Sequence, residues 1–242
     1  MPYYDEPSNA ITVSYATEFV ELTSDVGTFA KIELDGYLAG ALTLISRSLI
    51  NNAQFNVVDF IVERMAYAIK RFIENQLLNG YDTTTLSAGI TGLSTLTNSI
   101  TAAATTAITA DEVIRLHDKI KDDFQTNAIW IMSPATRTAL RTLKSSTGYY
   151  LLNDDISTPF GTTLLGKPVY VSDNMPDMAA GKTAIYYGDM RGLATKFSEE
   201  MSIEVLREKY ATQHAVGVVG WLEFDSKVED AQKIAKLVMA AS

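Results

Sequence analysis

The 242-residue sequence contains no cysteine and only two histidines, His117 and His214. Disulfide bonds, thiolate nucleophiles and thiolate metal sites are therefore excluded. No HExxH, GxSxG, GxxxxGKS/T or GxGxxG pattern occurs, so there is no sign of a zinc-protease helix, a hydrolase elbow or a phosphate-binding loop. Adjacent carboxylates such as Asp154-Asp155 are typical of surface loops. The sequence predicts no catalytic residue, no metal site and no cofactor.

Targeting signals and basic patches are also scarce. The N-terminal sequence, MPYYDEPSN, has no basic region followed by an apolar region, so no secretory signal is expected. The apolar runs are far shorter than the roughly 20 residues of a membrane helix, so no membrane contact is expected. Net charge is -9, which disfavours direct binding to phosphates. The composition, 47% hydrophobic and 20% charged, is typical of a folded cytoplasmic protein.

The first half of the chain predicts a hairpin and a long helix. Residues 11–45 alternate β-forming and polar residues around the turn sequence SDVG, which predicts two strands with polar side chains on both faces. Such a hairpin is not expected to be buried within its own chain. Apolar residues recur at helical spacing from Asn56 to Asn79, and Gly80 follows, which predicts a helix about 35 Å long. Residues 80–108 predict connecting structure with a short strand or turn at GITGL.

The second half alternates helices and strands. Thr109 and Glu112 fit a capping box at the start of an amphipathic helix. AIWIM (128–132) predicts a strand, and Ser133-Pro134 is a typical start for the helix after it. Further strands are expected at KPVYVSD, KTAIYYGD, MSIEVLRE, QHAVGVVGWLEF (long and central) and QKIAKLVMA. This half of the chain is therefore predicted to be an α/β region.

The order of these segments resembles that of tailed-bacteriophage major capsid proteins. FAKIELDGYLAGALTLISRSLINNA is similar to the second strand of the family's E-loop and the short helix after it. FIVERMAYAIKRFIENQLLNG is similar to the spine helix, and AIWIMSPATRTALRTLKSSTGYYLL to a strand, a Pro-capped helix and a turn. LLGKPVYVSDNMP, IYYGDM and the last 36 or so residues are similar to later strands of the family. Each motif alone is weak evidence for the family. Together they occur in the family's order from about residue 11 to the end of the chain, and this order supports the resemblance.

The resemblance implies an α+β capsid fold with four parts. Residues 1–10 would be a remnant of the N-terminal arm and 11–45 the E-loop, which reaches a neighbouring subunit. The peripheral domain with the spine helix would comprise 46–108 and 196–226, and the axial domain 109–195 and 227–242.

The implied function is structural, not enzymatic. The chain would form pentamers and hexamers of an icosahedral shell around DNA in the virion of a phage or prophage, assembled in the host cytoplasm. A scaffold or protease and a portal are the other implied partners. One alternative is an encapsulin-like nanocompartment, which needs a docking groove for a cargo peptide. Another is a hydrolase, which needs a concave pocket holding a carboxyl of raised pKa.

Charge distribution suggests a contact between subunits. Residues 1–35 contain seven acidic residues and one lysine. We expect Glu18, Glu21 and Glu33 to lie near a neighbour's Arg64, Lys70 and Arg71, the alternative being that all six are solvated. Some relatives link subunits through a Lys–Asn isopeptide bond, but ELTSDVGTF contains no lysine and no asparagine lies near Ala215 and Val216. No such covalent link is expected here.

Overall fold

The computed structural model describes residues 2–4, 29–81, 88–143, 153–154 and 162–241, and its chain divides into two units. The first unit, residues 1–34, contains an antiparallel pair of short strands. These strands are β1 (Pro2–Tyr4) and β2 (Phe29–Lys31). The second unit, residues 35–242, contains the two larger sheets and the helices described below.

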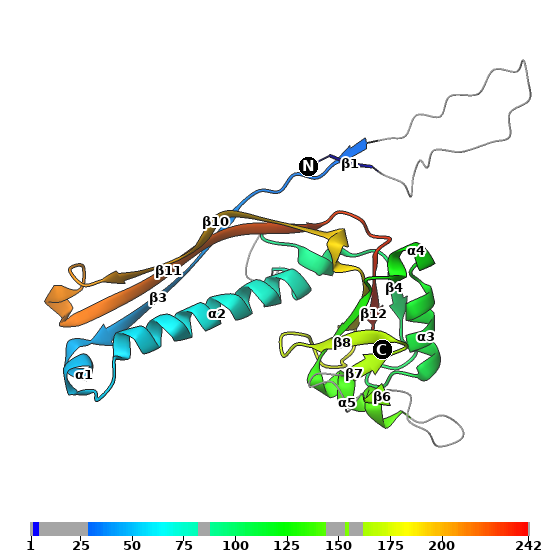
Figure 1. Ribbon diagram of the computed structural model, residues 1–242, viewed down its shortest axis with the longest axis horizontal. Coiled ribbons are helices and arrows are strands. Elements are labelled where there is room, and N and C mark those ends of the chain that lie inside the picture. The colour runs from blue at the N-terminus through cyan, green and yellow to red at the C-terminus, as the bar shows by residue number, and fades with distance from the viewer. Residues whose placement is uncertain (1, 5–28, 82–87, 144–152, 155–161, 242) are drawn as a thin grey trace, which may run out of the picture. The chain divides into compact units, whose positions relative to one another are not determined.

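In one part of the second unit, a long helix packs against a three-stranded antiparallel sheet (Figure 1). The strand order is β10 (Leu193–Leu206), β11 (Ala215–Val228), β3 (Tyr37–Ser46). After β3 come the short helix α1 (Arg47–Asn52) and the long helix α2 (Val57–Asn79). The predicted long helix is confirmed to within one residue, and the long strand predicted at QHAVGVVGWLEF is confirmed as the central one.

Helix α2 packs on β11 because both present an apolar face to the other. Met65 and Ile69 of α2 pack with Val218, Leu222 and Phe224 of β11 in one buried cluster. The strand alternation turns every second β11 side chain toward the helix. Gly220 makes room for the close approach, since a β-carbon there would lie 2.8 Å from the Cδ1 of Ile69.

The second sheet has seven strands in the described part of the chain, in the order β4-β12-β9-β5-β8-β7-β6. Three helices accompany it: α3 (Ala110–Asp118), α4 (Asp122–Gln125) and α5 (Pro134–Thr142). The strands are β4 (Ser99–Thr101), β5 (Ile129–Met132), β6 (Asn153–Asp154), β7 (Thr162–Leu164), β8 (Lys167–Val171), β9 (Thr183–Gly188) and β12 (Ile234–Val238).

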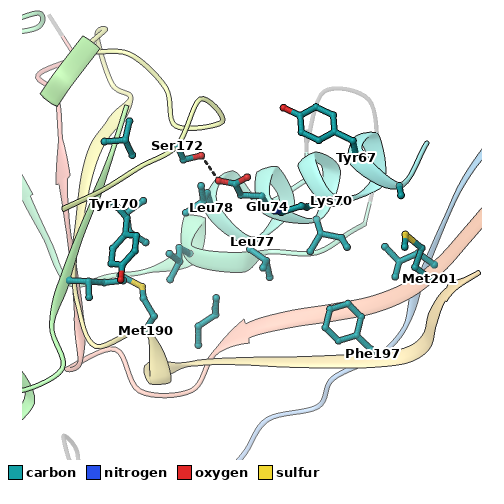
Figure 2. A pocket seen from close by; sticks show the side chains of 18 of the residues that line it. Tyr67, Lys70, Glu74, Leu77, Leu78, Tyr170, Ser172, Met190, Phe197 and Met201 are labelled. Atoms are coloured by element: carbon teal, nitrogen blue, oxygen red, sulfur yellow. Dashed lines mark hydrogen bonds between the residues drawn. The ribbon is translucent and has the colours of Figure 1, made fainter. Parts of the chain in front are cut away.

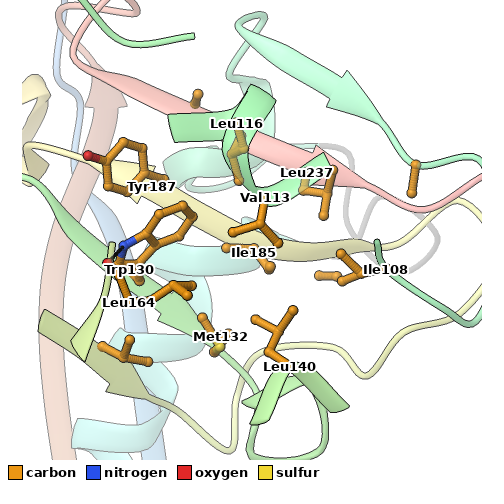
Figure 3. Close-up of a cluster of buried hydrophobic side chains, with 14 of the residues drawn as sticks. Ile108, Val113, Leu116, Trp130, Met132, Leu140, Leu164, Ile185, Tyr187 and Leu237 are labelled. Carbon is orange, nitrogen blue, oxygen red and sulfur yellow. Dashed lines mark hydrogen bonds between the residues drawn. The ribbon is translucent and has the colours of Figure 1, made fainter. Parts of the chain in front are cut away.

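The core of this region lies between the sheet and α3 (Figure 3). Trp130 of β5 and Tyr187 of β9 stack with ring centroids 4.1 Å apart, and both are fully buried. The indole N–H of Trp130 donates to the Leu164 carbonyl at 2.9 Å, which satisfies its one polar atom. Leu116 and Val113 close the core from the helix side.

The second of the two strands predicted within residues 11–45, over residues 29–45, is interrupted in the structure. Strand β2 ends at Lys31, β3 begins at Tyr37, and β3 pairs with β11 of the same chain. At the break, the Asp35 N–H donates to the buried Asp225 carboxylate at 3.0 Å. The Asp35 N–H is thus bonded to a side chain and not to a neighbouring strand. The first predicted strand of the hairpin, over residues 11–22, lies outside the described residues.

The segment GITGL (residues 89–93) contains no strand, and its last two residues begin a 3₁₀ helix, Gly92–Thr95, which agrees with the turn alternative. Gly92 has φ 52°, and a β-carbon there would lie 2.4 Å from the Leu77 carbonyl oxygen. This glycine therefore lets the chain turn closely against the end of α2. Strand β4 follows and pairs in parallel with β12, so residues 99–101 belong to the larger sheet.

Candidate subunit interface

The orientation of α2 is fixed by its first turn and its buried face. The Asn56 side chain accepts hydrogen bonds from the N–H groups of Val58 and Asp59, which satisfies two free donors at the helix start. Val57, Met65 and Ile69 are buried. The charged side chains between them must therefore point away from the sheet or to its sides.

The three predicted basic residues on α2 are exposed, but they do not share one side. At 100° per residue, Arg64 and Arg71 lie on the outward side of the helix, whereas Lys70 lies toward an adjacent groove. The Arg64 guanidinium sits 5.1 Å from the centroid of the Phe60 ring, a cation–π contact. Two of the three bases are therefore available together to a single partner surface.

Of the three predicted acids, only Glu33 is among the described residues. Its carboxylate accepts a hydrogen bond from the Lys31 ammonium at 2.6 Å, and both side chains are largely exposed. An exposed ion pair of this kind contributes little to stability and exchanges readily for another partner. Glu18 and Glu21 lie outside the described residues. The expected pairing with a neighbour's bases stays a prediction.

An apolar groove of about 1060 Å³ lies beside the C-terminal half of α2 (Figure 2). It is walled by α2, by β10 and by the larger sheet, through residues that include Leu77, Tyr170, Phe197 and Met201. At one side, the Ser172 hydroxyl donates to the Glu74 carboxylate at 2.5 Å, which connects the larger sheet to α2. Most of the lining side chains are apolar, and the charged ones are Lys70, Glu74 and Glu200, so the groove suits contact with an apolar partner.

The end of α2 is held to the larger sheet by two further hydrogen bonds. The Tyr186 hydroxyl donates to the Leu78 carbonyl at 2.8 Å, and the Asn79 amide donates to the Asn174 carbonyl at 2.7 Å. Burial raises the pKa of Tyr186 to about 12, so it remains a proton donor at neutral pH. The first hydrogen bond satisfies a carbonyl group at the helix end, and the second connects the last residue of α2 to the segment after β8.

The two histidines do not form a site. His117 stacks on Tyr187 with ring centroids 5.3 Å apart and contacts Asp118 through Nδ1 at 2.9 Å. His214 lies in the turn before β11 with φ 52°. Among the described residues no group of three or more histidine, aspartate or glutamate side chains could hold a metal ion. In the same part of the chain, no helix combines the length and apolarity needed to cross a membrane.

The buried acid Glu112 has the opposite of the pKa shift that the hydrolase alternative requires. Burial raises the pKa of its carboxyl, but hydrogen bonds from the Thr109 and Ala103 N–H groups outweigh this and hold the pKa below its ordinary value. The predicted capping box with Thr109 is confirmed. Glu112 therefore connects α3 to the segment after β4 and is not a general acid.

Sequence reasoning missed a set of exposed apolar residues on the three-stranded sheet. These are Leu38, Leu42 and Leu44 on β3 and Trp221 on β11. The alternation of β3 was noted, but which of its faces would be covered depends on its pairing with β11. Only the register between these strands, distant in sequence, shows that the four side chains share one face.

Comparisons with known proteins agree with this architecture. The profile of the Phage capsid family matches residues 2–239. No curated protein matches the chain. The structure is similar to the capsid of a native GTA particle computed with C5 symmetry, with a TM-score of 0.84 and 20% identity over 100% of this chain and 84% of that one. The capsid of the empty GTA particle has a TM-score of 0.78 and 22% identity, over 96% of this chain and 82% of that one. The structure from Gordonia phage Cozz has a TM-score of 0.74 and 16% identity, over 100% of this chain and 81% of that one.

The fold is thus that of the tailed-phage capsid subunits, as predicted. Solved structures at these identities establish the fold alone, whereas the profile match spans nearly the whole sequence. The chain belongs to the Phage capsid family, and it is a major capsid protein of a tailed phage or a GTA-like particle. The predicted resemblance and the predicted structural role are confirmed.

Proposed function

We propose that copies of this chain assemble into pentamers and hexamers of an icosahedral shell that encloses DNA in the virion. The family match over residues 2–239 carries this proposal. The five-fold symmetry named for the similar GTA capsid agrees with it. Scaffold or protease and portal proteins would be the other partners, and assembly would take place in the host cytoplasm. Within each subunit, residues 46–108 and 196–226 would form the peripheral domain, and residues 109–195 and 227–242 the axial domain.

The net charge of -9 supports DNA as cargo without base-specific contacts. A wall that repels phosphate lets packaged DNA move rather than adhere to it. The test is light scattering of the purified protein with negative-stain electron microscopy of the largest fraction. We expect rings or closed shells. A protein that remains monomeric at every concentration would contradict the proposal.

An encapsulin-like compartment is the second candidate, because the apolar groove beside α2 could accept a cargo peptide. The two functions differ in shell content. Shells isolated from the native host should contain nuclease-protected DNA if the chain encloses a genome, and a co-purifying enzyme without DNA if it encloses protein cargo. Absorbance ratios and gel analysis of the purified shells distinguish these outcomes.

We further propose that Glu18, Glu21 and Glu33 of the E-loop pair with Arg64, Lys70 and Arg71 of a neighbouring subunit. The exposure of the three bases supports this contact. Charge reversal at Arg64 and Lys70 should weaken assembly and reduce its dependence on salt, because screening acts on exposed pairs. Unchanged assembly with unchanged salt dependence would refute the pairing.

A further inference from the structure

The Asp225 carboxylate is buried on a face of the three-stranded sheet that also carries exposed apolar side chains. This outer sheet face, the face turned away from α2, includes Leu42 and Trp221. Asp225 belongs to it, because the preceding residue, Phe224, packs toward α2 and successive strand residues point to opposite faces. Trp221 is 42% exposed, whereas Asp225 is 0% exposed. Another segment of the chain must therefore cover the carboxylate.

The backbone at Asp35 is part of that cover. Its N–H donates to Oδ2 of Asp225 at 3.0 Å, and the Ser226 N–H donates to Oδ1 at 2.7 Å. Each carboxylate oxygen thus accepts one backbone hydrogen bond, and Lys227 Nζ lies 3.9 Å from Oδ2. Of the two hydrogen bonds, only the one from Asp35 joins segments that are distant in the sequence.

Asp35 is also the first residue of the second unit. The first unit ends one residue earlier, and the pairing of β3 with β11 begins at Tyr37. Gly36 lies between the two, and a β-carbon there would overlap the carboxylate of Glu223, so the chain passes close to β11. The hydrogen bond to Asp225 therefore holds the chain where it enters the second unit, before the strand ladder begins.

The use of a carboxylate at this place calls for an explanation. Removing an ionised group from water costs free energy, which an apolar side chain of similar size would not cost. An apolar residue could fill the same space, but it could not accept a hydrogen bond from the Asp35 N–H. What the carboxylate of Asp225 adds is a fixed position for that backbone group.

We infer that Asp225 is a positioning residue that anchors the base of the E-loop. The segment before Asp35 contains Glu18, Glu21 and Glu33, the acids proposed to pair with a neighbouring subunit. By holding the backbone at Asp35, the buried carboxylate limits where this segment starts and thus which positions on a neighbour it can reach. The inference rests on the proposed contact of the E-loop with a neighbour and names the residue that prepares it.

Hydrogen exchange of the unassembled subunit tests the anchor. In Asp225→Ala, deuterium exchange at the Asp35 N–H should become about tenfold faster, because one buried hydrogen bond of typical strength is lost. Exchange in α2 should stay as in the wild type, which separates local release from a general loss of stability. The matched control is Glu223→Ala, which removes a partly buried carboxylate from the same face without removing the acceptor for Asp35. Unchanged exchange at Asp35, or an equal rise in the control or in α2, would overturn the inference.

Assembly tests whether the anchor positions the loop. Asp225→Ala should yield free subunits or irregular particles in place of closed shells, whereas Glu223→Ala should assemble normally. Asp35→Pro removes the donor instead, at an exposed position, and should cause the same loss. Both changes together should be no worse than either alone, because they break one hydrogen bond.

Normal assembly of Asp225→Ala, or losses that add in the double variant, would overturn the inference. If Asp225→Ala does not fold, normal assembly of Asp35→Pro would overturn it. A wild-type chain that forms no shells would instead refute the proposed function, and exchange at Asp35 would still test the anchor.

Discussion

At the scale of single residues, Glu112 stabilises two connections with one carboxylate. Its Oε2 accepts from the Thr109 N–H at 2.7 Å and closes the capping box of α3. Its Oε1 accepts from the Ala103 N–H at 2.6 Å, in the segment after β4. The side chain is buried, so neither hydrogen bond can be replaced by water without rearrangement.

Replacing Glu112 by Gln should lower the free energy of unfolding by about 1–3 kcal/mol at neutral pH, because one buried N–H loses its acceptor. The pKa of Glu112 is lowered in the folded subunit, so its contribution is present above the ordinary value of 4.5 and is lost as the pH falls through the lower folded value. The difference in the free energy of unfolding between wild type and variant should therefore become smaller as the pH falls through the folded-state pKa of Glu112. Urea unfolding measures both effects.

The control for this prediction is Asp111→Asn. Asp111 is the exposed neighbour in the same helical turn, so its effect should stay below about 1 kcal/mol. An equal loss of stability in both variants would show that charge near the helix N-terminus, rather than the buried hydrogen bonds, is responsible.

At the scale of elements, the packing of α2 on the three-stranded sheet depends on Phe224. This side chain is fully buried and makes an edge contact with Phe72 of α2 and a stacked contact with Phe197 of β10. One ring thus joins the helix to two strands. The hydrophobic pattern of α2 predicted that it had a buried face, but not which strand would cover it.

Phe224→Ala should cost about 3–5 kcal/mol in the free energy of unfolding, because a buried ring leaves a cavity between helix and sheet. Phe197→Ala, at a half-exposed position that contacts the same ring, should cost less than about 1.5 kcal/mol. Denaturant unfolding of both variants provides the comparison. Equal losses would mean that the cavity closes and that Phe224 has no special role.

At the scale of the whole molecule, we expect shell stability to come from non-covalent contact. The sequence contains no cysteine, and ELTSDVGTF contains no lysine. Disulfides are therefore impossible, and a Lys–Asn link lacks its amine at the place where the family resemblance would put it. Apolar surfaces such as the outer sheet face are then the natural source of association free energy.

Assembled shells, boiled in detergent, should run as a single monomer band with or without a reducing agent. A ladder of higher bands would reveal a covalent cross-link through other residues. Because exposed ion pairs are screened and apolar burial is not, the shells should also loosen only partly at high salt. Complete dissociation by salt alone would show that charge pairs dominate the interfaces.

Much of the fold could be predicted because its signals are local. The helical spacing from Asn56 to Asn79, the capping box at Thr109 and the Ser133-Pro134 helix start all act within a few residues. Strand positions followed from short apolar runs. The break at Asp35 could not be predicted in this way, because it depends on a carboxylate 190 positions away at Asp225.

The sequence by itself determined the elements, their order, the absence of thiol chemistry and, through that order, the family. Periodicity, capping and composition are properties of neighbouring residues, so they can be read without a fold. Tertiary structure alone decided which face of β3 is covered, that Gly40 lies beneath Trp221, and that the Asp225 carboxylate lies beside the Asp35 N–H. These facts depend on strand register, which is set by packing between segments distant in the chain.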